Sequence, residues 1–428
     1  MNVTTLMNTA PAATWEVWAI AALATAGVIA RPWRLPEFVW AVAGAAALVA
    51  LGLLPLTQVG AAVAEGADVY LFLVGMMLLA EVARREGLFD HVAARAVRAA
   101  RGSPRRLFAL VYLVGTVVTV FLSNDATAVV MTPAVYAAAK AGRAEPLPYL
   151  FICAFVANAA SFVLPISNPA NLVIFRDHMP PLLEWLARFA LPSLLAIAAT
   201  YGALRLAQRA ALTGELARDA DVPPLLGGGR LAGWGIGLAA TALLTASALD
   251  TKLGWPTCLA GALTAVAAQA RRREAPWRLL AGVSWGVLPL VAGLFVLVRG
   301  VERTGVVREL GAFLADAART APAGTAGLSG LAIGFVSNLM NNLPAGLIGG
   351  SLVTQGQLPP QVAAGLLIGV DLGPNLSITG SLATILWLVA LRREGEEVGF
   401  GRFLRLGAIV MPPALLLTLG GMLVAGSL

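Results

Sequence analysis

The sequence predicts an all-α polytopic membrane protein made of two inverted-topology repeats. Only 12% of its residues are charged and 58% are hydrophobic, whereas soluble domains carry about 25% charged residues. Many stretches hold about 20 apolar residues, enough to cross a hydrocarbon core about 30 Å thick. Polar residues interrupt two apolar runs at matching places, over Leu122 to Thr127 and over Ser337 to Pro344. We therefore expect about ten full spans, two re-entrant hairpins and two broken helices, an arrangement typical of secondary transporters.

The first repeat is expected over residues 1–208. Its full spans are predicted at residues 15–30, 36–56, 68–84 and 189–208. Residues 88–101 carry apolar side chains at helical spacing and arginines on the opposite side, which indicates a helix lying at the membrane surface. A hairpin is expected at about 107–139 and a broken helix at about 147–176. Residues 128–139 would rise only about 18 Å as a helix, too little for a full span, so re-entry is favoured.

The second repeat is expected over residues 231–428, after a linker at 209–230 that holds charged residues, prolines and three consecutive glycines. Its full spans are predicted at residues 231–249, 255–270, 280–298 and 403–426. A surface stretch at 304–319, a hairpin at about 326–354 and a broken helix at about 360–391 complete the plan.

Short stretches of the two halves also match residue by residue. Gly87 lies beside Gly305, and Ser123-Asn124 lies beside Ser337-Asn338. Residues 158–175 can be laid without gaps on residues 371–388, which pairs Asn158 with Asp371 and Asn168 with Ser381. Weak internal similarity of this kind indicates a duplicated transporter fold.

The basic residues predict the orientation in the membrane. The net charge is +7, and the Lys and Arg residues gather in short loops between apolar runs, as the positive-inside rule requires, so nucleic-acid binding is not expected. The linker 209–230 is then cytoplasmic, both termini are outside, and the membrane is the inner (plasma) membrane. If both interrupted runs crossed the bilayer instead, the basic residues would separate only modestly worse. Residues 1–14 carry no basic residue, so no cleavable signal peptide is expected.

The polar interruptions predict the functional site. Non-helical backbone at membrane depth is tolerated only where protein or a wet cavity satisfies it, so two hairpin tips and two broken helices should meet around one small cavity. An acid inside the membrane is a functional candidate by default, which singles out Asp125 and Asp371 for proton coupling. The predicted substrate-binding side chains are Ser123, Asn124, Asn168, Asn338, Asn341, Asn342, Asn375, Ser377, Thr379 and Ser381. Each Asn or Ser taken singly also fits a purely structural role, as a hydrogen bond between helices.

The chemistry of this lining indicates the class of substrate. Amide and hydroxyl groups pair donors with acceptors without adding charge, which suits a small, neutral, hydroxyl-rich solute. An aspartate held away from bulk water can load and release protons near neutral pH. The two cysteines, Cys153 and Cys258, both lie in apolar runs, so we expect neither a disulfide framework nor a metal site nor any bound cofactor.

At several motifs the chain resembles the bacterial arsenite efflux permeases of the ArsB type, within a wider ion transporter superfamily. The motifs are Gly75 to Glu81, Arg84 to Asp90, Ser123-Asn124-Asp125 with Thr132-Pro133, Met340 to Pro344, Gly369 to Asn375, and Gly380 to Trp387. The resemblance runs nearly end to end. It implies export of trivalent arsenic or antimony, as neutral hydroxides, in exchange for protons. From the superfamily it also implies that hairpins and broken helices shift as a rigid unit past the other spans.

The expected mechanism joins the residues with this resemblance. Deprotonated Asp125, or Asp371, accepts hydrogen bonds from the As–OH groups on the cytoplasmic side. A proton from outside then occupies that acceptor and releases the substrate. No thiol is expected at the site, so the metalloid would be held as a substrate in this pocket and not as a bound metal.

Two other functions remain open at this stage. One is a sodium–proton antiporter or dicarboxylate carrier on the same scaffold, although Asp125 would repel an anion. The other is the membrane subunit of an ATP-driven pump. The sequence has no phosphate-binding loop, so a soluble arsenite-stimulated ATPase would have to be a separate protein, and we do not expect an enzyme here. A passive channel fits least well, because paired hairpins would be superfluous in it.

Overall fold

A computed structural model describes residues 12–176, 179–217, 224, 225, 227–249 and 251–425 of the protein. Within those residues all the regular structure is helical, so the predicted all-α class is confirmed. The helices of the first half are α2 (Ala12–Ala30), η1 (Pro32–Arg34), α3 (Glu37–Ala50), α4 (Leu56–Glu65), α5 (Ala67–Arg85), α6 (Leu88–Ala99), α7 (Pro104–Leu122), α8 (Asn124–Ala126), η2 (Thr127–Met131), α9 (Thr132–Ala141), α10 (Leu147–Ala159), η3 (Pro165–Ser167), α11 (Pro169–Ile174) and α12 (Leu182–Ala207).

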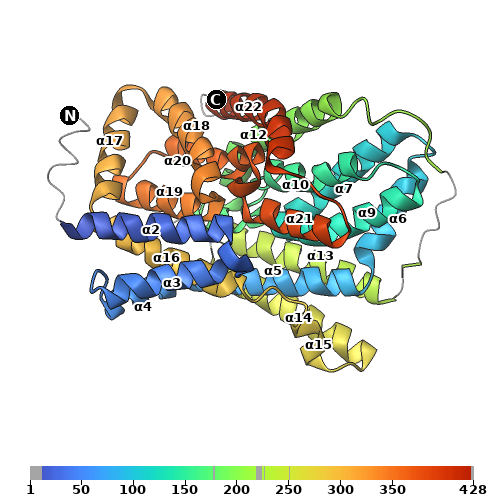
Figure 1. The fold of residues 1–428 in the computed structure, drawn as a ribbon, viewed down its shortest axis with the longest axis horizontal. Helices are drawn as coiled ribbons and strands as arrows, with labels where there is room; N and C mark the ends of the chain where they lie inside the picture. The colour runs from blue at the N-terminus through green and yellow to red at the C-terminus, as the bar shows by residue number, and fades with distance from the viewer. Residues whose placement is uncertain (1–11, 177–178, 218–223, 226, 250, 426–428) are drawn as a thin grey trace.

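A similar order of helices follows in the second half. Its helices are α13 (Gly227–Ala248), α14 (Gly254–Arg272), α15 (Pro276–Leu280), α16 (Val287–Arg303), α17 (Val306–Thr320), α18 (Pro322–Met340), α19 (Asn342–Gly356), α20 (Pro360–Leu372), η4 (Gly373–Leu376), η5 (Ile378–Gly380), α21 (Leu382–Arg393) and α22 (Phe400–Ala425). In Figure 1, α6, α7 and α9 lie at one end of the elongated molecule, whereas α17, α18 and α19 lie at the other.

Each half packs partly on the other. Helix α3 packs against α16 and α5 against α14, while α12 packs against α22. Small residues allow the closest of these approaches: a Cβ on Gly75 would lie 2.2 Å from the carbonyl oxygen of Thr257, and one on Gly261 would lie 2.4 Å from that of Gly75. Such backbone contacts are how helices associate in lipid, where burial of apolar surface drives little.

In each half, one helix packs against the helices on both sides of the polar interruption. Helix α6 packs against both α7 and α9, and α17 packs against both α18 and α19. Gly87 and Gly305 begin these two flanking helices with positive φ angles of 68° and 85°, which glycine adopts without strain. In each half, the helices before and after the polar interruption therefore lie beside the same flanking helix.

Helix length and hydropathy identify the helices that could cross a membrane. Among the described residues, α7, α12, α13, α18 and α22 are long and apolar enough to cross a bilayer. A sixth such segment is counted if α4 and α5, which meet at a bend of 48°, form one span. Residues 15–30 of α2, together with α3 and α10, are apolar but shorter.

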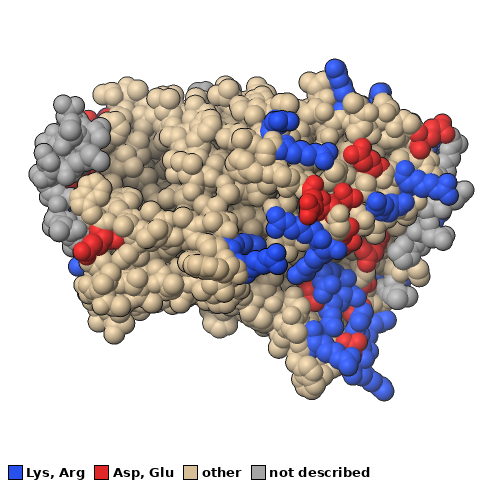
Figure 2. Space-filling view, viewed as in Figure 1, with Lys and Arg blue, Asp and Glu red and all other residues tan. Residues whose placement is uncertain are grey.

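Charged side chains gather at one end of the molecule. Figure 2 shows most of the visible Lys, Arg, Asp and Glu over the end where α6, α9 and α15 lie in Figure 1, while the rest of this face is almost free of charge. Exposed apolar side chains such as Trp234, Leu328 and Leu339 lie along the helices instead. Bare apolar helix surfaces between polar ends are what a lipid-facing protein presents.

Several boundaries differ from the sequence-based expectation, and three show the physical reason. The span predicted at 36–56 ends as a helix at Ala50, because Gly52 turns the chain with φ 69° and Pro55 precedes a new helix, α4. The predicted linker is shorter, because its glycine run already belongs to α13. The span predicted at 280–298 begins as α16 only at Val287, after a short turn.

The break in the second half lies within the polar stretch that the sequence predicts, Ser337 to Pro344, but not at the start of that stretch. The pairing with Ser123-Asn124 pointed to Ser337-Asn338. Helix α18 continues through those residues to Met340, and the break falls at Asn341. The pairing of Ser123 with Ser337 was therefore wrong by one helical turn, because a polar pair inside a helix does not by itself interrupt it.

Candidate functional site

The first hairpin tip is held by local capping. Ser123 ends α7 and its Oγ accepts a hydrogen bond of 3.4 Å from the backbone N–H of Ala126. Asn124 Oδ1 accepts one of 2.9 Å from the backbone N–H of Asp125. Ser123 and Asn124 are buried, whereas the Asp125 side chain is only half-buried. Asp125 therefore lies in the first turn of the helix that these caps begin, where the backbone amide dipoles favour a negative charge.

The first broken helix is supported by asparagines. After α10 ends at Ala159, Asn171 Nδ2 donates to the carbonyls of Ser161 at 2.8 Å and Leu164 at 3.3 Å. Asn168 caps α11, and its Oδ1 accepts from the backbone N–H of Ala170 at 3.0 Å. Both asparagines are buried. Carbonyls freed by the break thus find partners inside the protein, as they must at membrane depth.

Hydrogen bonds within the second half hold the other hairpin to the other broken helix. Asn338 Nδ2 donates to the carbonyls of Gly334 at 2.9 Å and Gly373 at 3.0 Å, and its Oδ1 accepts from both the backbone N–H and the hydroxyl of Ser377. The hydroxyl of Thr379 donates to the carbonyl of Asn338 at 2.8 Å. Asn341 Nδ2 donates to the carbonyl of Thr379 at 3.3 Å. These four predicted substrate-binding side chains, Asn338, Asn341, Ser377 and Thr379, are therefore bonded to the scaffold and to one another.

Two side-chain hydrogen bonds connect the broken helices across the halves. Asn168 Nδ2 donates to Asp371 Oδ1 at 2.7 Å. Asn158 Nδ2 donates to Asn375 Oδ1 at 3.0 Å, and Asn375 Nδ2 donates in turn to the carbonyl of Phe155 at 3.0 Å. Asn158, Asp371 and Asn375 are fully buried and Asn168 is nearly so. The two breaks therefore form one polar centre.

A small cavity adjoins this polar centre at Asn168. Its volume is about 20 Å³, and Asn124, Asp125, Asn168 and Asn342 form its polar wall. Pro169 and apolar side chains complete the lining, namely Leu73, Val287, Val291, Leu343 and Leu382. One water-sized group needs about 10–15 Å³, so the cavity has room for about one such group. A carboxylate and three carboxamides thus converge from both hairpin tips and from the first break.

A larger cavity of about 640 Å³ also reaches Asp125. Ser123 and Asp125 lie on its wall, together with Glu81, Arg84 and Arg393. Arg393 ends α21 and Arg84 is near the end of α5, so this cavity extends from the hairpin tip toward the charged end seen in Figure 2. Asp125 therefore lines both cavities.

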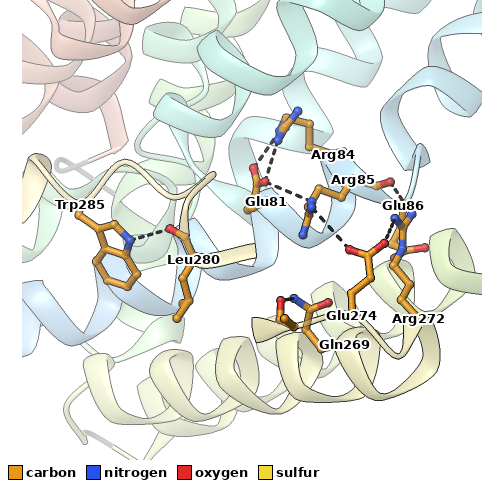
Figure 3. Close-up of polar contacts among 10 residues, drawn as sticks. Glu81, Arg84, Arg85, Glu86, Gln269, Arg272, Glu274, Leu280 and Trp285 are labelled. Atoms are coloured by element: carbon orange, nitrogen blue, oxygen red, sulfur yellow. Dashed lines mark hydrogen bonds and ion pairs between the residues drawn. The ribbon is translucent and has the colours of Figure 1, made fainter. Parts of the chain in front are cut away.

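Ion pairs border the larger cavity at that charged end. Arg84 Nη2 lies 2.7 Å from Glu81 Oε1, as Figure 3 shows. Arg272 Nε donates to Glu86 Oε1 at 2.5 Å, and this bond raises the pKa of the Arg272 guanidinium above its usual value. Arg85 lies 3.7 Å from Glu274 of the loop after α14. The end of α5 is thereby attached to the second half.

The predicted site residues thus fall into three groups. Asn124, Asp125, Asn168 and Asn342 line the small cavity, and Ser123 lines the larger one. Asp371, Asn375 and Ser381 are buried outside both linings, where Ser381 Oγ caps α21 through the backbone N–H of Ala383 at 3.1 Å. The hydrogen-bonded group of Asn338, Asn341, Ser377 and Thr379 is the third.

Sequence reasoning left out two residues near the site. Asn158 connects the two breaks through Asn375, outside both cavity linings, and its gapless pairing with Asp371 was the signal that marked it. Glu81 lines the larger cavity, although it is not among the predicted site residues. Neither Cys153 nor Cys258 lies on either cavity wall. Among the described residues no three His, Cys, Asp or Glu side chains are grouped to hold a metal ion.

Comparison with known proteins assigns the family. A model of the citrate transporter family, CitMHS, matches residues 17–369, most of the chain. The chain belongs to this family. With its apolar helices, this membership makes the protein a multi-pass membrane transporter.

Several bacterial transporters are similar in sequence to this protein over most of its length. The arsenical pump membrane protein of Yersinia enterocolitica is 26% identical over 367 residues, which cover 82% of this chain and 84% of the relative. That of Escherichia coli strain K12 is 27% identical over 369 residues, with the same coverage. An uncharacterized transporter of Mycobacterium tuberculosis is 28% identical over 424 residues, 92% of this chain and 95% of the relative. The resemblance inferred from the motifs is therefore confirmed.

A solved structure shares the fold. The YdaH transporter of Alcanivorax borkumensis superposes with a TM-score of 0.54 at 18% identity, covering 87% of each chain. At this identity the likeness concerns the arrangement of helices alone.

Proposed function

We propose that this protein exports arsenite or antimonite, as the neutral trihydroxide, in exchange for protons. The observation that carries the proposal is the position of Asp125, which lines both cavities beside the amides of Asn124, Asn168 and Asn342. One exchangeable acid among neutral donors and acceptors suits an uncharged, hydroxyl-rich substrate. The relatives named arsenical pump membrane proteins support the same substrate class.

The proposed exchange uses one acceptor twice. Ionised Asp125 accepts hydrogen bonds from two hydroxyls of the substrate, while carboxamides of Asn124 and Asn342 bond the remaining oxygen atoms. Protonation of Asp125 converts the acceptor into a neutral acid and removes the charge-assisted bonds, so the substrate leaves. The proton is released again when Asp125 faces the other side. Each turnover thus moves one neutral substrate against one proton at this carboxyl.

The proposed transport movement relies on two inverted repeats, residues 1–208 and 231–428. Helices α7 and α18 have the same length of 19 residues, and α10 and α20 have the same length of 13. The reciprocal packing of α3 on α16 and of α14 on α5 also supports the duplication. We propose that α7 with α9, and α18 with α19, are re-entrant hairpins that shift with the broken helices past the remaining spans.

We propose that the protein lies in the inner membrane and that its charged end faces the cytoplasm. The linker is then cytoplasmic and both termini are outside. Figure 2 supports this orientation, because Lys and Arg side chains gather at that end. The larger cavity, lined by Arg84 and Arg393, would then admit substrate from the cytoplasm.

The test is arsenite uptake into inverted membrane vesicles. With an imposed gradient, acid inside, the wild type should accumulate arsenite without added ATP, and an uncoupler should abolish accumulation. Asp125→Asn should lose gradient-driven uptake by at least about a hundredfold, because two charge-assisted hydrogen bonds of about 1.5–3 kcal/mol each disappear. Wild-type uptake that ignores the gradient but requires ATP and a soluble ATPase would contradict the exchange and favour the pump alternative.

A carboxylate carrier is the second candidate, because the family model is that of a citrate transporter and because two arginines line the larger cavity. Asp125 opposes this reading, since an ionised carboxylate at the site repels an anion. Labelled citrate and labelled arsenite, each with and without sodium, distinguish the two in the same vesicles. Sodium-dependent citrate uptake in the absence of arsenite uptake would replace the first proposal by the second.

A further inference from the structure

The two aspartates predicted to couple protons differ in their access. Asp125 is half-buried and lines both cavities. Asp371 has no exposed surface and lines neither of these cavities. Its Oδ2 is buried and has no hydrogen-bond partner among the described residues. Only Asp125 is therefore placed where a substrate and a proton can compete for the same oxygen.

Asp371 nevertheless contacts the wall of the small cavity through Asn168. The amide of Asn168 lines that cavity, and its Nδ2 donates to Asp371 Oδ1 at 2.7 Å. Its Oδ1 accepts from the backbone N–H of Ala170. With partners on both ends the amide has one orientation, which leaves its second N–H available as a donor.

The other half of the molecule contains a natural comparison. Asn158 ends α10 as Asp371 ends α20, and the gapless match of the two segments pairs these residues. Asn158 binds the opposite break as well, through Asn375 at 3.0 Å. It does so with a neutral amide, and its Oδ1 is also buried with no hydrogen-bond partner within the described part of the chain. A neutral side chain therefore suffices for this structural connection.

We propose that Asp371 is a positioning residue, which orients the Asn168 amide at the cavity, and that Asp125 alone exchanges the transported proton. This inference rests on the proposed function and assigns different roles to the two aspartates. Changing the charge of the fully buried Asp371 carboxyl in every transport cycle would cost several kcal/mol. Its hydrogen bond to Asn168 needs only an acceptor oxygen, which both protonation states of Asp371 provide. The bond to Asn168 therefore persists while Asp125 titrates.

The test compares variants that retain or remove this bond. Asp371→Asn retains an acceptor oxygen, so uptake should fall no more than about threefold and should stay gradient-driven with the wild-type pH profile. Asp371→Leu removes the acceptor, so the KM for arsenite should rise about tenfold or more, with uptake still dependent on the gradient. Asn168→Asp should be impaired because two acids would then face each other. The exchanged pair, Asn168→Asp with Asp371→Asn, should recover most of that loss.

A matched control separates positioning from general stability. Asn158→Leu removes the equivalent connection, whose two side chains lie outside the linings of both cavities. It should lower the Tm of the purified protein while changing the KM for arsenite less than about twofold. If Asn158→Leu raises KM as much as Asp371→Leu, the role of Asp371 is only structural and the proposal fails.

Loss of gradient-driven uptake in Asp371→Asn, with wild-type Tm and wild-type arsenite binding, would also overturn the proposal, since Asp371 would then carry the proton. Failure of the proposed function is distinguishable from both results. In that case the wild type itself accumulates no arsenite. The Tm values of Asn168→Asp, Asp371→Asn and their combination then decide whether the bond forms, because a real bond makes the combined loss smaller than the sum.

Discussion

Ser123 and Asn341 occupy the same place in two helical breaks: each directly follows a helix of 19 residues, and each has a positive φ, 132° and 79°. Each side chain also caps the helix that follows, Ser123 through Ala126 and Asn341 through Leu343. A positive φ with an extended ψ is almost confined to glycine and costs about 1–3 kcal/mol for other residues. Strain is thus present at both tips of the proposed site.

Replacing Ser123 tests this strain. Ser123→Gly should retain the fold and arsenite uptake, because glycine adopts this backbone freely and the lost cap bond is long, 3.4 Å. Ser123→Val should lower the stability by about 2 kcal/mol or more, because a β-branched side chain tolerates positive φ poorly. Thermal unfolding of both purified variants in detergent is the measurement. A valine variant as stable as the glycine variant would contradict the backbone geometry at this tip.

Close packing of α5 on α14 gives a second prediction. Gly75→Ala places a methyl group 2.2 Å from a backbone carbonyl of α14, so the helices must separate, at a cost of about 1–3 kcal/mol. The control is Gly202→Ala in α12, where a Cβ meets nothing within 4 Å. That change should be neutral or stabilising by up to about 1 kcal/mol. Equal Tm values for the two variants would argue against the contact.

Ion pairs at the end opposite the charged end give a third prediction. Glu302 is 8% exposed and lies 3.5 Å from Arg176 and 3.2 Å from Arg299, and it bonds the hydroxyl of Ser351. Glu302→Gln should therefore lower stability by about 1–3 kcal/mol, because it removes the charge that balances nearby arginines. The measurement is again thermal unfolding, repeated in high salt.

An exposed pair supplies the control for that network. Arg188 lies 2.6 Å from Glu184, whose side chain is 54% exposed. Glu184→Gln should change stability by less than about 1 kcal/mol, and added salt should reduce the effect further. If both glutamine variants unfold at the wild-type temperature, the Glu302 network does not stabilise the fold.

Cysteine replacement gives a fourth prediction. Trivalent arsenic favours soft thiolate ligands, yet Cys153 is buried inside α10 and Cys258 lies in α14, away from both cavity linings. The double variant Cys153→Ala and Cys258→Ala should therefore show a KM for arsenite within about twofold of the wild type. A large rise in KM, with normal expression and Tm, would mean that a thiol takes part in transport.

Much of the fold is readable from local sequence. The apolar runs and their polar interruptions predict helices and breaks, because hydrophobicity and helix interruption are properties of short segments. Asp125 lines both cavities, and its proton-coupling role stays a prediction that rests on an acid lying within an apolar run. The second break falls at Asn341, inside the predicted polar stretch, whereas Asn338 stays within α18 and donates to the carbonyls of Gly334 and Gly373.

The sequence by itself determined the class of the protein, its family and the residues that interrupt its helices, because each of these is written in contiguous stretches of chain. Only the tertiary structure decided which polar groups meet. Asn168 and Asp371 are 203 residues apart and form a hydrogen bond. Ser377 and Thr379, by contrast, bond Asn338 and line neither cavity. An amide can satisfy its donors and acceptor with many partners, and only the relative placement of distant helices selects among them.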